Sequence, residues 1–583
     1  MCGIAGIARS DGIPVSRPIL EKMTRALIHR GPDDEGFFYA QEGPASVGLG
    51  FRRLSIIDVQ GGHQPMALGP FTLIFNGEIY NYRELKKECE MRGRTFCTQS
   101  DTEVILHLFD QHGESALKKL NGMFALAIWN SQKSELLLAR DPMGIKPLYY
   151  THEAKTLAFA SEIKSLYLSG LVPLEFDPPA IYDYFSYRFA PSPRTVLKSV
   201  RKVPPGKFLR FSQGKITEGI YSDWPRPVLD ERPYEQIQKE LEVLLEEAVK
   251  SQMVSDVPLG AFLSGGVDSS LVTALMAKNS SRKVQTFSIG FERASGVNES
   301  PYARQVAKHL GTEHHELILT GSDIASSEKV FSRMNEPVAD PTILPTAILS
   351  EFTRQSVKVA LTGEAADELF GGYNRYKNVR YPFLNGFRKI RPEEWFSQNR
   401  DFSPQELRSL FPDWAPESTC LSAGAEGVDP LNAILALECR TSLVDRLLMK
   451  VDMASMAYSL EARPPYLDPR VVEFSMNIPA KFKIRRFKGK YILRKIAEKY
   501  LPKNICWRRK HGFVVPILNW VHARGRDWLT SVLTPSFLAE IPFLDSAAVQ
   551  KHLEKSYNSP HPNEIAILWP LAVLALWRKS LKE

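Results

Sequence analysis

The sequence predicts an α/β protein of two domains, and three observations support this prediction. The chain has 583 residues, which is too many for one ordinary core, since domains usually hold about 100 to 200 residues. Short β-type runs separated by turn signals fill residues 1–210, whereas apolar strands alternate with helices in residues 211–583. Segments rich in Pro and Gly lie between the two patterns. We therefore assign residues 1–210 and 211–583 to the two domains, with the boundary inside residues 205–230.

The chain begins with Met1-Cys2-Gly3. Removal of Met1 would leave Cys2 with both a thiol and a free α-amine. A thiolate is the attacking form of cysteine, and an α-amine titrates near pH ~8, so it can accept the thiol proton and later return it to a leaving amine. The start of the chain therefore predicts an N-terminal nucleophile.

The rest of the first domain has the pattern of a β-sheet. Residues 71–75 and 124–129 are β-type runs, and the turn pairs Asn76-Gly77 and Asn130-Ser131 follow them. An amphipathic helix at residues 234–253 then opens the second domain.

Three buried parallel strands are expected in the second domain, at residues 260–263, 284–289 and 357–361. Each ends in a loop with Gly or acidic residues, and in doubly wound sheets ligands bind at the carboxyl ends of the strands. The apolar stretch at residues 565–577 is interrupted by Pro570 and is shorter than the ~20 residues that span a bilayer. We expect a buried C-terminal helix there and no membrane segment.

The first of these loops reads Leu263-Ser264-Gly265-Gly266-Val267-Asp268-Ser269-Ser270 and opens a helix. Small residues allow the main chain to approach phosphate oxygens, the helix N-terminus attracts anions, and Asp268 is a suitable magnesium ligand. The pattern differs from GxxxxGK[ST] of Walker nucleotidases. It is similar to the pyrophosphatase loop of enzymes that adenylate a substrate.

A second loop, at residues 362–373, carries Glu364, Asp367 and Glu368 within five residues. Acids this close repel each other unless a metal or a cation binds them; the alternative is an exposed acidic turn. The basic run at residues 481–510 contains one acid, Glu498. This run is either a solvated surface or a wall that faces nucleotide phosphates, in which Lys510 would stabilise a transferred phosphoryl group or a tetrahedral intermediate.

Composition excludes several classes of protein. A net charge of +8 is small for this length and does not favour a nucleic-acid partner. The six cysteines have neither CxxC pairs nor metal-ligand spacing, so no disulfide framework or zinc site is expected. A reducing cytoplasm fits this usage.

Together these segments resemble the glutamine-dependent asparagine synthetase family, in the family's order and over nearly the whole chain. In the first domain the matching segments are Cys2-Gly3-Ile4, His29-Arg30-Gly31-Pro32-Asp33, Arg53-Leu54-Ser55-Ile56, Asn76-Gly77-Glu78-Ile79-Tyr80-Asn81 and Ser100-Asp101-Thr102-Glu103. Residues 459–468 are similar to the family's later signature. The resemblance implies an N-terminal nucleophile-type α/β/β/α sandwich, a class II glutamine amidotransferase domain. A doubly wound parallel-sheet ATP-pyrophosphatase domain with a helical C-terminal part would follow it.

The resemblance also implies roles for individual residues. Cys2 would be the nucleophile, and the Asn76 side chain with the Gly77 amide would form the oxyanion hole. Glutamine would be bound by Arg53, Asn76, Glu78 and Asp101. ATP phosphates and Mg²⁺ would contact Ser264, Gly265, Gly266, Asp268, Ser269 and Ser270, with Asp367 as a second metal contact. Leu263, Ile289 and Gly363 would surround the adenosine, and Glu364 and Lys510 would form the catalytic pair at the acyl adenylate.

In the implied reaction, Cys2 releases ammonia from glutamine, and an apolar tunnel carries it to an acyl adenylate made from MgATP and a carboxylic acid. Aspartate is the leading acceptor, which would give asparagine, AMP and pyrophosphate. Residues 336–342 instead resemble a bacterial branch that also includes amide-forming enzymes of other pathways, so another acceptor stays open. Residues 364–367 read Glu-Ala-Ala-Asp where many members have a Gly, which predicts a stiffer loop. A homodimer and a non-catalytic glutamine-sensing scaffold are further possibilities.

Overall fold

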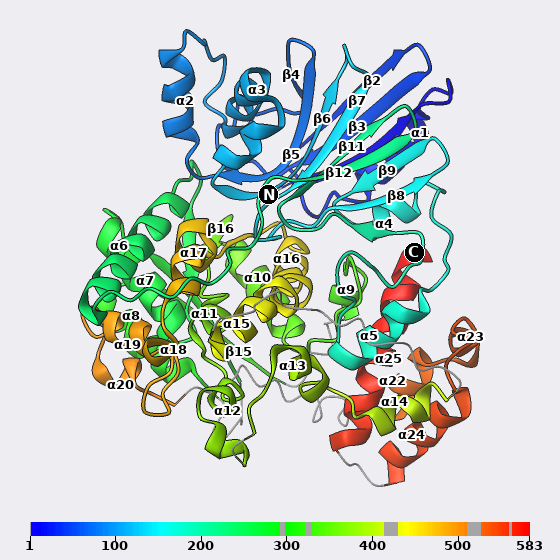
Figure 1. The fold of residues 1–583 in the computed structure, drawn as a ribbon. Helices are drawn as coiled ribbons and strands as arrows, with labels where there is room; N and C mark the ends of the chain where they lie inside the picture. The colour runs from blue at the N-terminus through cyan, green and yellow to red at the C-terminus, as the bar shows by residue number, and fades with distance from the viewer. Residues whose placement is uncertain are drawn as a thin grey trace.

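The structure is a computed structural model that describes residues 2–291, 298–320, 328–386, 388–412, 429–509, 526–558 and 562–582. Figure 1 shows the strands of the first domain above a larger, helix-rich second domain. Within the described ranges, no helix is both long enough and apolar enough to cross a membrane.

Two antiparallel sheets form the centre of the first domain, with the strand orders β10-β8-β9-β1-β3-β2 and β12-β11-β7-β6-β5-β4. The strands of the first sheet are β1 (Gly3–Arg9), β2 (Asp34–Glu42), β3 (Ala45–Arg53), β8 (Tyr149–Glu153), β9 (Thr156–Ala160) and β10 (Arg201–Lys202). Those of the second are β4 (Met66–Leu68), β5 (Phe71–Ile79), β6 (Gly122–Asn130), β7 (Glu135–Arg140), β11 (Lys207–Ser212) and β12 (Lys215–Ile220).

These sheets pack face to face, and helices cover their outer faces. Alternation along β1 shows how: Ile4 and Ala8 belong to the apolar core between the sheets, whereas Ala5 and Ile7 belong to the core on the helix side. Helices α1 (Arg17–Arg25) and α4 (Ile163–Tyr167) pack on the first sheet, and α3 (Asp101–His112) packs on the second. Helix α2 (Tyr82–Met91) and the 3-10 turn η1 (Gly113–Lys119) lie against α3. The predicted α/β/β/α sandwich is confirmed. The turn predicted at Asn76-Gly77 is wrong, because β5 continues through both residues, which pair with Ala125 and Phe124 of β6.

The first domain extends beyond its predicted end. Strand β12 pairs with β11, and the two close as a hairpin through Gln213 and Gly214, both with positive φ. A boundary at residue 210 would cut this hairpin, so the sheet ends at Ile220, still inside the window of residues 205–230.

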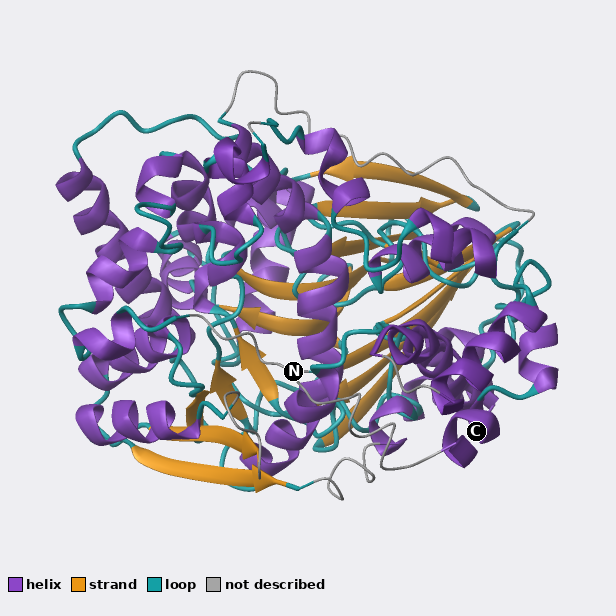
Figure 2. Ribbon diagram, turned by 90° about the horizontal axis from the view of Figure 1, so that it is seen from below, coloured by secondary structure: helices purple, strands orange, loops and turns teal. Residues whose placement is uncertain are grey.

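The second domain is built on a five-stranded parallel sheet in the order β15-β14-β13-β16-β17. Its strands are β13 (Leu259–Phe262), β14 (Gln285–Phe291), β15 (Glu313–Leu319), β16 (Val359–Leu361) and β17 (Glu461–Arg463). Helices α7 (Val267–Asn279) and α8 (Ser300–Leu310) contact each other and the sheet, as do α10 (Ile343–Arg354) and α16 (Met449–Met456). Figure 2 shows helices on both sides of the strands, as the doubly wound prediction requires.

The remaining helical segments surround this centre. They are α5 (Pro178–Tyr187), α6 (Tyr234–Gln252), α9 (Glu328–Phe331), α11 (Ala366–Phe370), α12 (Tyr376–Arg380), η3 (Pro382–Asn385), α13 (Pro392–Gln398), α14 (Pro404–Leu410), α15 (Pro430–Arg440), η4 (Leu443–Leu448), η5 (Pro465–Leu467), α17 (Pro469–Asn477), α18 (Ala480–Lys483), α19 (Tyr491–Ala497), α20 (Lys503–Cys506), α22 (Arg526–Val532), α23 (Pro535–Ala539), α24 (Ser546–Asn558) and α25 (Pro562–Lys582). The predicted C-terminal helix is α25, whose residues 567–575 are buried. Pro570 lies inside it.

One apolar core continues across both domains. It includes Leu54, Phe75 and Phe124 from the first domain and Ala261 and Val359 from the parallel sheet. A shared core of this kind fixes the two domains relative to each other, because separating them would expose apolar surface.

Candidate active sites

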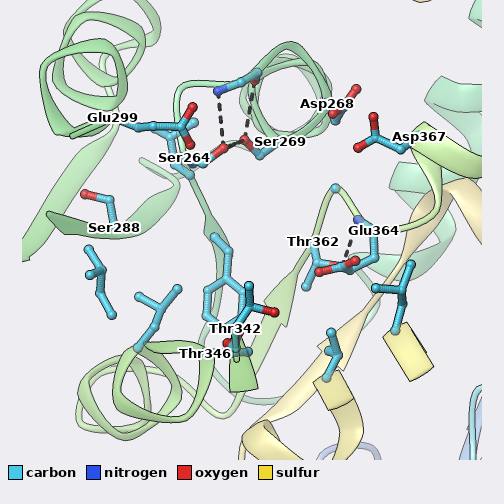
Figure 3. A pocket seen from close by; sticks show the side chains of 18 of the residues that line it. Ser264, Asp268, Ser269, Ser288, Glu299, Thr342, Thr346, Thr362, Glu364 and Asp367 are labelled. Atoms are coloured by element: carbon cyan, nitrogen blue, oxygen red, sulfur yellow. Dashed lines mark hydrogen bonds between the residues drawn. The ribbon is translucent and has the colours of Figure 1, made fainter. Parts of the chain in front are cut away.

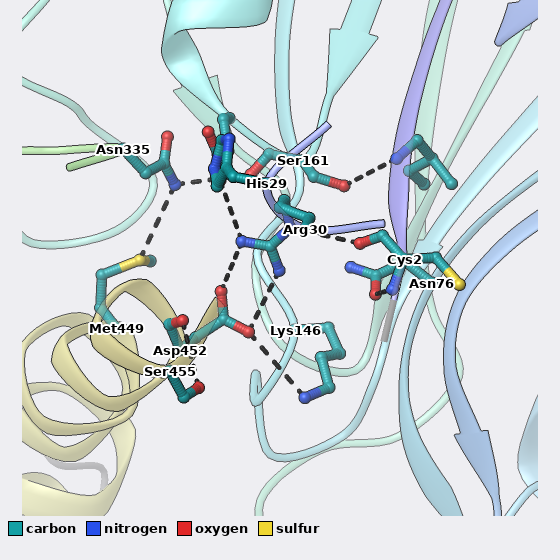
Figure 4. A network of polar contacts seen from close by, with 12 residues as sticks. Cys2, His29, Arg30, Asn76, Lys146, Ser161, Asn335, Met449, Asp452 and Ser455 are labelled. Atoms are coloured by element: carbon teal, nitrogen blue, oxygen red, sulfur yellow. Dashed lines mark hydrogen bonds and ion pairs between the residues drawn. The ribbon is translucent and has the colours of Figure 1, made fainter. Parts of the chain in front are cut away.

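The first candidate site lies at the start of β1, where Cys2 is only 7% exposed. Burial raises the pKa of its thiol, so a nearby base is needed to form the thiolate. The Cys2 nitrogen donates to Asn76 Oδ1 at 2.9 Å, and the Cys2 carbonyl accepts from Arg30 Nε at 3.2 Å (Figure 4). Hydrogen bonds on both sides therefore fix the backbone that carries the thiol.

Two groups beside Cys2 are suited to bind an oxyanion. Because Asn76 Oδ1 already accepts a hydrogen bond, its Nδ2 faces elsewhere; it is buried and has no partner among the described residues. Buried donors are rarely left unpaired, which indicates a place for a ligand acceptor. Gly77 must be glycine, since a Cβ there would lie 2.1 Å from the Met123 carbonyl oxygen.

Arg53 lies at the end of β3, and its guanidinium is hydrogen-bonded to the loop that follows, at residues 57–59. Nη1 donates to the Val59 carbonyl at 3.0 Å, and Nη2 donates to the carbonyls of Ile57 at 3.2 Å and Asp58 at 2.6 Å. Three of the five guanidinium N–H groups are used in this way. The other two are left for a ligand, such as the glutamine carboxylate that the sequence predicts.

Two buried acids complete this site. Asp101 begins α3 and accepts from the Ile79 amide at 3.0 Å, and burial raises its pKa to about 6. Burial also raises the pKa of Glu78 well above its usual value. Arg463, on β17 of the second domain, lies 3.5 Å from Glu78. The structure thus places the residues predicted for glutamine near one another and adds Arg463 beside them. The sequence analysis marked residues 459–468 as a signature but gave Arg463 no role.

The raised pKa of Asp101 leads to a pH prediction. A carboxylate must be ionised to attract the α-ammonium of glutamine, and a pKa of about 6 means that protonation begins just below neutral pH. We expect the KM for glutamine to rise as pH falls below about 6, approaching tenfold per pH unit. Glutaminase kinetics from pH 5 to 8 check this, and Asp101→Asn should flatten the profile. A constant KM across that range would contradict the assignment.

The second candidate site is a cavity of about 530 Å³ at the carboxyl ends of β13, β14 and β16 (Figure 3). Parallel strands carry their ligand loops at this edge. The predicted residues that line it are Leu263, Ser264, Gly266, Asp268, Ser269, Ile289, Gly363, Glu364 and Asp367. The two loops chosen from the sequence therefore face one cavity.

Two residues predicted to contact ATP do not line this cavity. Gly265 has φ +74°, and a Cβ there would lie 2.5 Å from the Ala303 nitrogen, so this glycine serves the turn and its packing on α8. Ser270 is fully buried in α7, one residue past the part of the helix that faces the cavity. Proximity in sequence to Ser269 does not give it access to a ligand.

Lys490 is a residue of this site that the sequence analysis did not select. Its ammonium lies 2.5 Å from Asp268 Oδ2 and 2.6 Å from Asp367 Oδ1. Lys490 is buried and lines the cavity. It therefore links the loop after β13, through Asp268, to the loop after β16, through Asp367. The available signal was its place in the basic run of residues 481–510.

The same carboxylates fit a magnesium ion held together with phosphate oxygens. Asp268 Oδ1 is buried and has no hydrogen-bond partner among the described residues. Carboxylate and phosphate oxygens are the ligands that Mg²⁺ prefers, and it usually takes only one or two carboxylates. No group of three or more His, Cys, Asp or Glu suited to a metal occurs in the described ranges, so the phosphates would have to supply further ligands.

Glu364 lines the same cavity, on the loop after β16 that also carries Asp367 (Figure 3). Next to it, Ala365 has φ +74°, a left-handed conformation that costs a non-glycine residue about 1 to 3 kcal/mol. This is the position where the sequence departs from a glycine, so the loop holds strain as well as stiffness. Lys510, the predicted partner of Glu364, lies outside the described residues.

The basic run of residues 481–510 is divided between the large cavity and the exposed surface. Lys490, Arg494, Arg508 and Arg509 line the cavity. Residues 485, 486 and 488 are instead exposed. One part of the run therefore faces the candidate nucleotide site, and another is solvated surface.

The end of the cavity away from α7 carries groups of both signs. Asp340 accepts from Arg446 Nε at 2.9 Å, and Lys450 lies nearby, where it helps to lower the pKa of Asp340. Lys450 is buried and has no hydrogen bond or ion pair among the described residues. Glu336, from the same segment as Asp340, does not reach the cavity, because it is buried against Lys202 at 3.1 Å.

Charged and apolar residues occupy the space between the two sites. Arg30 contacts the Cys2 carbonyl and pairs with Asp452 at 2.9 Å (Figure 4). Asp452 also borders a small second cavity, whose other lining residues are Ile145, Lys146, Thr362, Glu364, Leu448, Val451, Ala462 and Pro464. The lining is thus mixed, whereas an entirely apolar passage was predicted.

Known proteins resemble this chain over nearly its whole length. A family described as Asparagine synthase matches residues 240–579, and one described as Glutamine amidotransferase domain matches residues 1–222. Asparagine synthetase [glutamine-hydrolyzing] 1 of Bacillus subtilis is 35% identical, over 92% of this chain and 90% of its own. A putative asparagine synthetase of Mycobacterium tuberculosis H37Rv is 34% identical, over 100% and 98%. Asparagine synthetase B of Escherichia coli is 30% identical, over 88% and 82%.

Proposed function

Since the chain belongs to the family of glutamine-hydrolysing asparagine synthetases, we propose that it moves the amide nitrogen of glutamine to a carboxylic acid activated by ATP. The chain is an enzyme of the amidotransferase and ligase type. Its two candidate sites correspond to the two halves of such a reaction.

In the first half, the Cys2 thiolate attacks the side-chain carbonyl of glutamine. Once Met1 is removed, the Cys2 α-amine accepts the thiol proton and gives it to the departing ammonia. Asn76 Nδ2, which is buried without a partner, and the Gly77 amide donate to the oxygen that becomes negative. Water then hydrolyses the glutamyl thioester and releases glutamate.

In the second half, ATP binds with its phosphates at the loop that opens α7. The acceptor carboxylate attacks the α-phosphorus, pyrophosphate leaves, and ammonia then displaces AMP from the acyl adenylate. Glu364 accepts a proton from the attacking ammonia, and Lys510 stabilises the tetrahedral intermediate. Asp268 and Asp367 would hold Mg²⁺, which when bound neutralises phosphate charge.

The position of Glu364 is the observation that carries this proposal. It borders both the large cavity and the small one. From the small cavity, contacts lead through Asp452 and Arg30 to the Cys2 carbonyl. We propose that ammonia released at Cys2 passes along this buried region to Glu364, the residue that would take its proton. A passage closed to bulk water would keep ammonia from being protonated and lost.

The far end of the large cavity favours an amino acid as acceptor. Lys450 offers an ammonium to a carboxylate. Asp340, whose carboxylate already accepts from Arg446 and Thr342, contributes a negative charge that attracts an ammonium. Aspartate carries both groups and a second carboxylate to activate, so asparagine, AMP and pyrophosphate are the expected products. Another carboxylic acid is the alternative acceptor.

The test uses glutamine labelled with nitrogen-15 in the side-chain amide. Protein with Met1 removed is incubated with MgATP, aspartate, labelled glutamine and an excess of unlabelled ammonium, and products are identified by mass spectrometry. Labelled asparagine formed with AMP would support the reaction and the protected route together. Unlabelled asparagine would refute the route. Glutamate formed without asparagine would point to another acceptor, and no turnover at all would favour a non-catalytic scaffold.

A further inference from the structure

The loop that wraps Arg53 is under conformational strain. Its central residue, Asp58, has φ +47°, a left-handed conformation that is less favourable than for glycine and that Asp adopts mainly when its side chain forms local hydrogen bonds. The carboxylate of Asp58 accepts from the Gly61 amide at 2.9 Å and the Gln99 amide at 2.8 Å. These bonds hold residues 58–61 in a tight turn, and Arg53 gains its carbonyl partners only while that turn persists.

The second domain supplies two further bonds to this loop, both through Asp256. Asp256 Oδ2 accepts from the Asp58 amide at 2.8 Å, and the Asp256 amide donates to the Ile56 carbonyl at 3.1 Å. Asp256 thus binds the loop at Asp58 and two residues before it, at Ile56.

Asp256 stands on a rigid support. It lies just before β13, the central strand of the parallel sheet. The amide of Lys358, just before the neighbouring strand β16, donates to the Pro258 carbonyl at 3.2 Å. Residues carried on packed strands hold a partner more precisely than residues on free loops. The carboxyl end of the same strand leads into the candidate ATP loop at Ser264.

We infer that Asp256 is a positioning residue for glutamine, so that the glutamine site of the first domain is completed by the second. The inference rests on the proposed function, because it gives Arg53 a glutamine carboxylate to bind. Without the Asp256 carboxylate the strained turn at Asp58 relaxes, and Arg53 loses the carbonyls that orient it. Binding of glutamine weakens, while the chemistry at Cys2 is unchanged.

The test compares the full-length enzyme with its Asp256→Ala and Asp256→Asn variants in glutamine hydrolysis and in ammonia-dependent synthesis. In Asp256→Ala the KM for glutamine should rise about fivefold to tenfold, the size expected for losing one ordinary hydrogen bond. Its kcat and its ammonia-dependent synthesis should stay within about twofold. Asp256→Asn keeps an oxygen that accepts from the Asp58 amide, so it should restore the KM.

Lys358→Ala is the matched control. It removes an interdomain ion pair with Asp33 at 2.8 Å, of similar exposure, but leaves the bonds of the loop intact. An equal rise in KM in this variant would show general loosening of the interface and overturn the inference, as would an unchanged KM in Asp256→Ala. If the unaltered enzyme hydrolyses no glutamine, the proposed function itself fails. A working enzyme with an insensitive Asp256→Ala variant would refute only the positioning role.

Discussion

Replacing Cys2 by alanine is expected to abolish amide synthesis from glutamine, by at least about 10³-fold, and to leave synthesis from free ammonia within about twofold of normal. The thiol forms the only covalent bond to glutamine in the proposed reaction. Ammonia added to the solution needs only the second site, which does not contain Cys2. The measurement is product formation with each nitrogen source, at saturating MgATP and aspartate.

Cys89→Ala is the matched control for this prediction. Cys89 is likewise buried in the first domain, within α2, and burial also raises the pKa of its thiol. It has no part in the proposed reaction, so both activities should persist. If Cys2→Ala still makes product from glutamine at a normal rate, the nucleophile lies elsewhere. If it loses the ammonia reaction as well, the two halves are not separable as proposed.

The fold was predictable because its signals are local. The turn after residues 124–129 and the loop after residues 260–263 both follow short apolar runs, and these strands end where the runs end. The class of each domain follows from these alternations. The end of the first domain was less predictable, since β12 has an exposed, polar composition and owes its existence to pairing with β11.

The candidate sites were predictable only where a short segment carries the chemistry. Ser264, Asp268 and Asp367 belong to such segments, and all three side chains line the large cavity. Asp256 carries no such mark, and it lies before β13, at the amino-terminal edge of the parallel sheet. Arg463 lies inside the signature of residues 459–468, but its approach to Glu78 from the carboxyl end of β17 follows only from the fold. Contacts between residues about 200 or more positions apart arise from topology, which single-sequence patterns do not encode.

Lys490 gives the second large expected effect. Lys490→Met should lower ATP-dependent amide synthesis by about 10² to 10³-fold with either nitrogen source, while glutamine hydrolysis in the same molecules continues. The reason is electrostatic: Asp268 and Asp367 converge on one ammonium, and removing it leaves two facing carboxylates where triphosphate must bind. Pyrophosphate release and glutamate release, measured on the same samples, separate this effect from unfolding.

Lys495→Met is the control for charge alone, because Lys495 belongs to the same basic run but pairs with Glu498 at 2.9 Å, outside the residues that line the cavity. It should behave normally, and Lys490→Arg should keep part of the activity by retaining a cation. The KM for MgATP decides between two roles of Lys490. If the lysine binds phosphate, Lys490→Met raises that KM. If it only fills the metal position until MgATP arrives, its removal frees both carboxylates, the KM falls, and the phosphate-binding role is refuted.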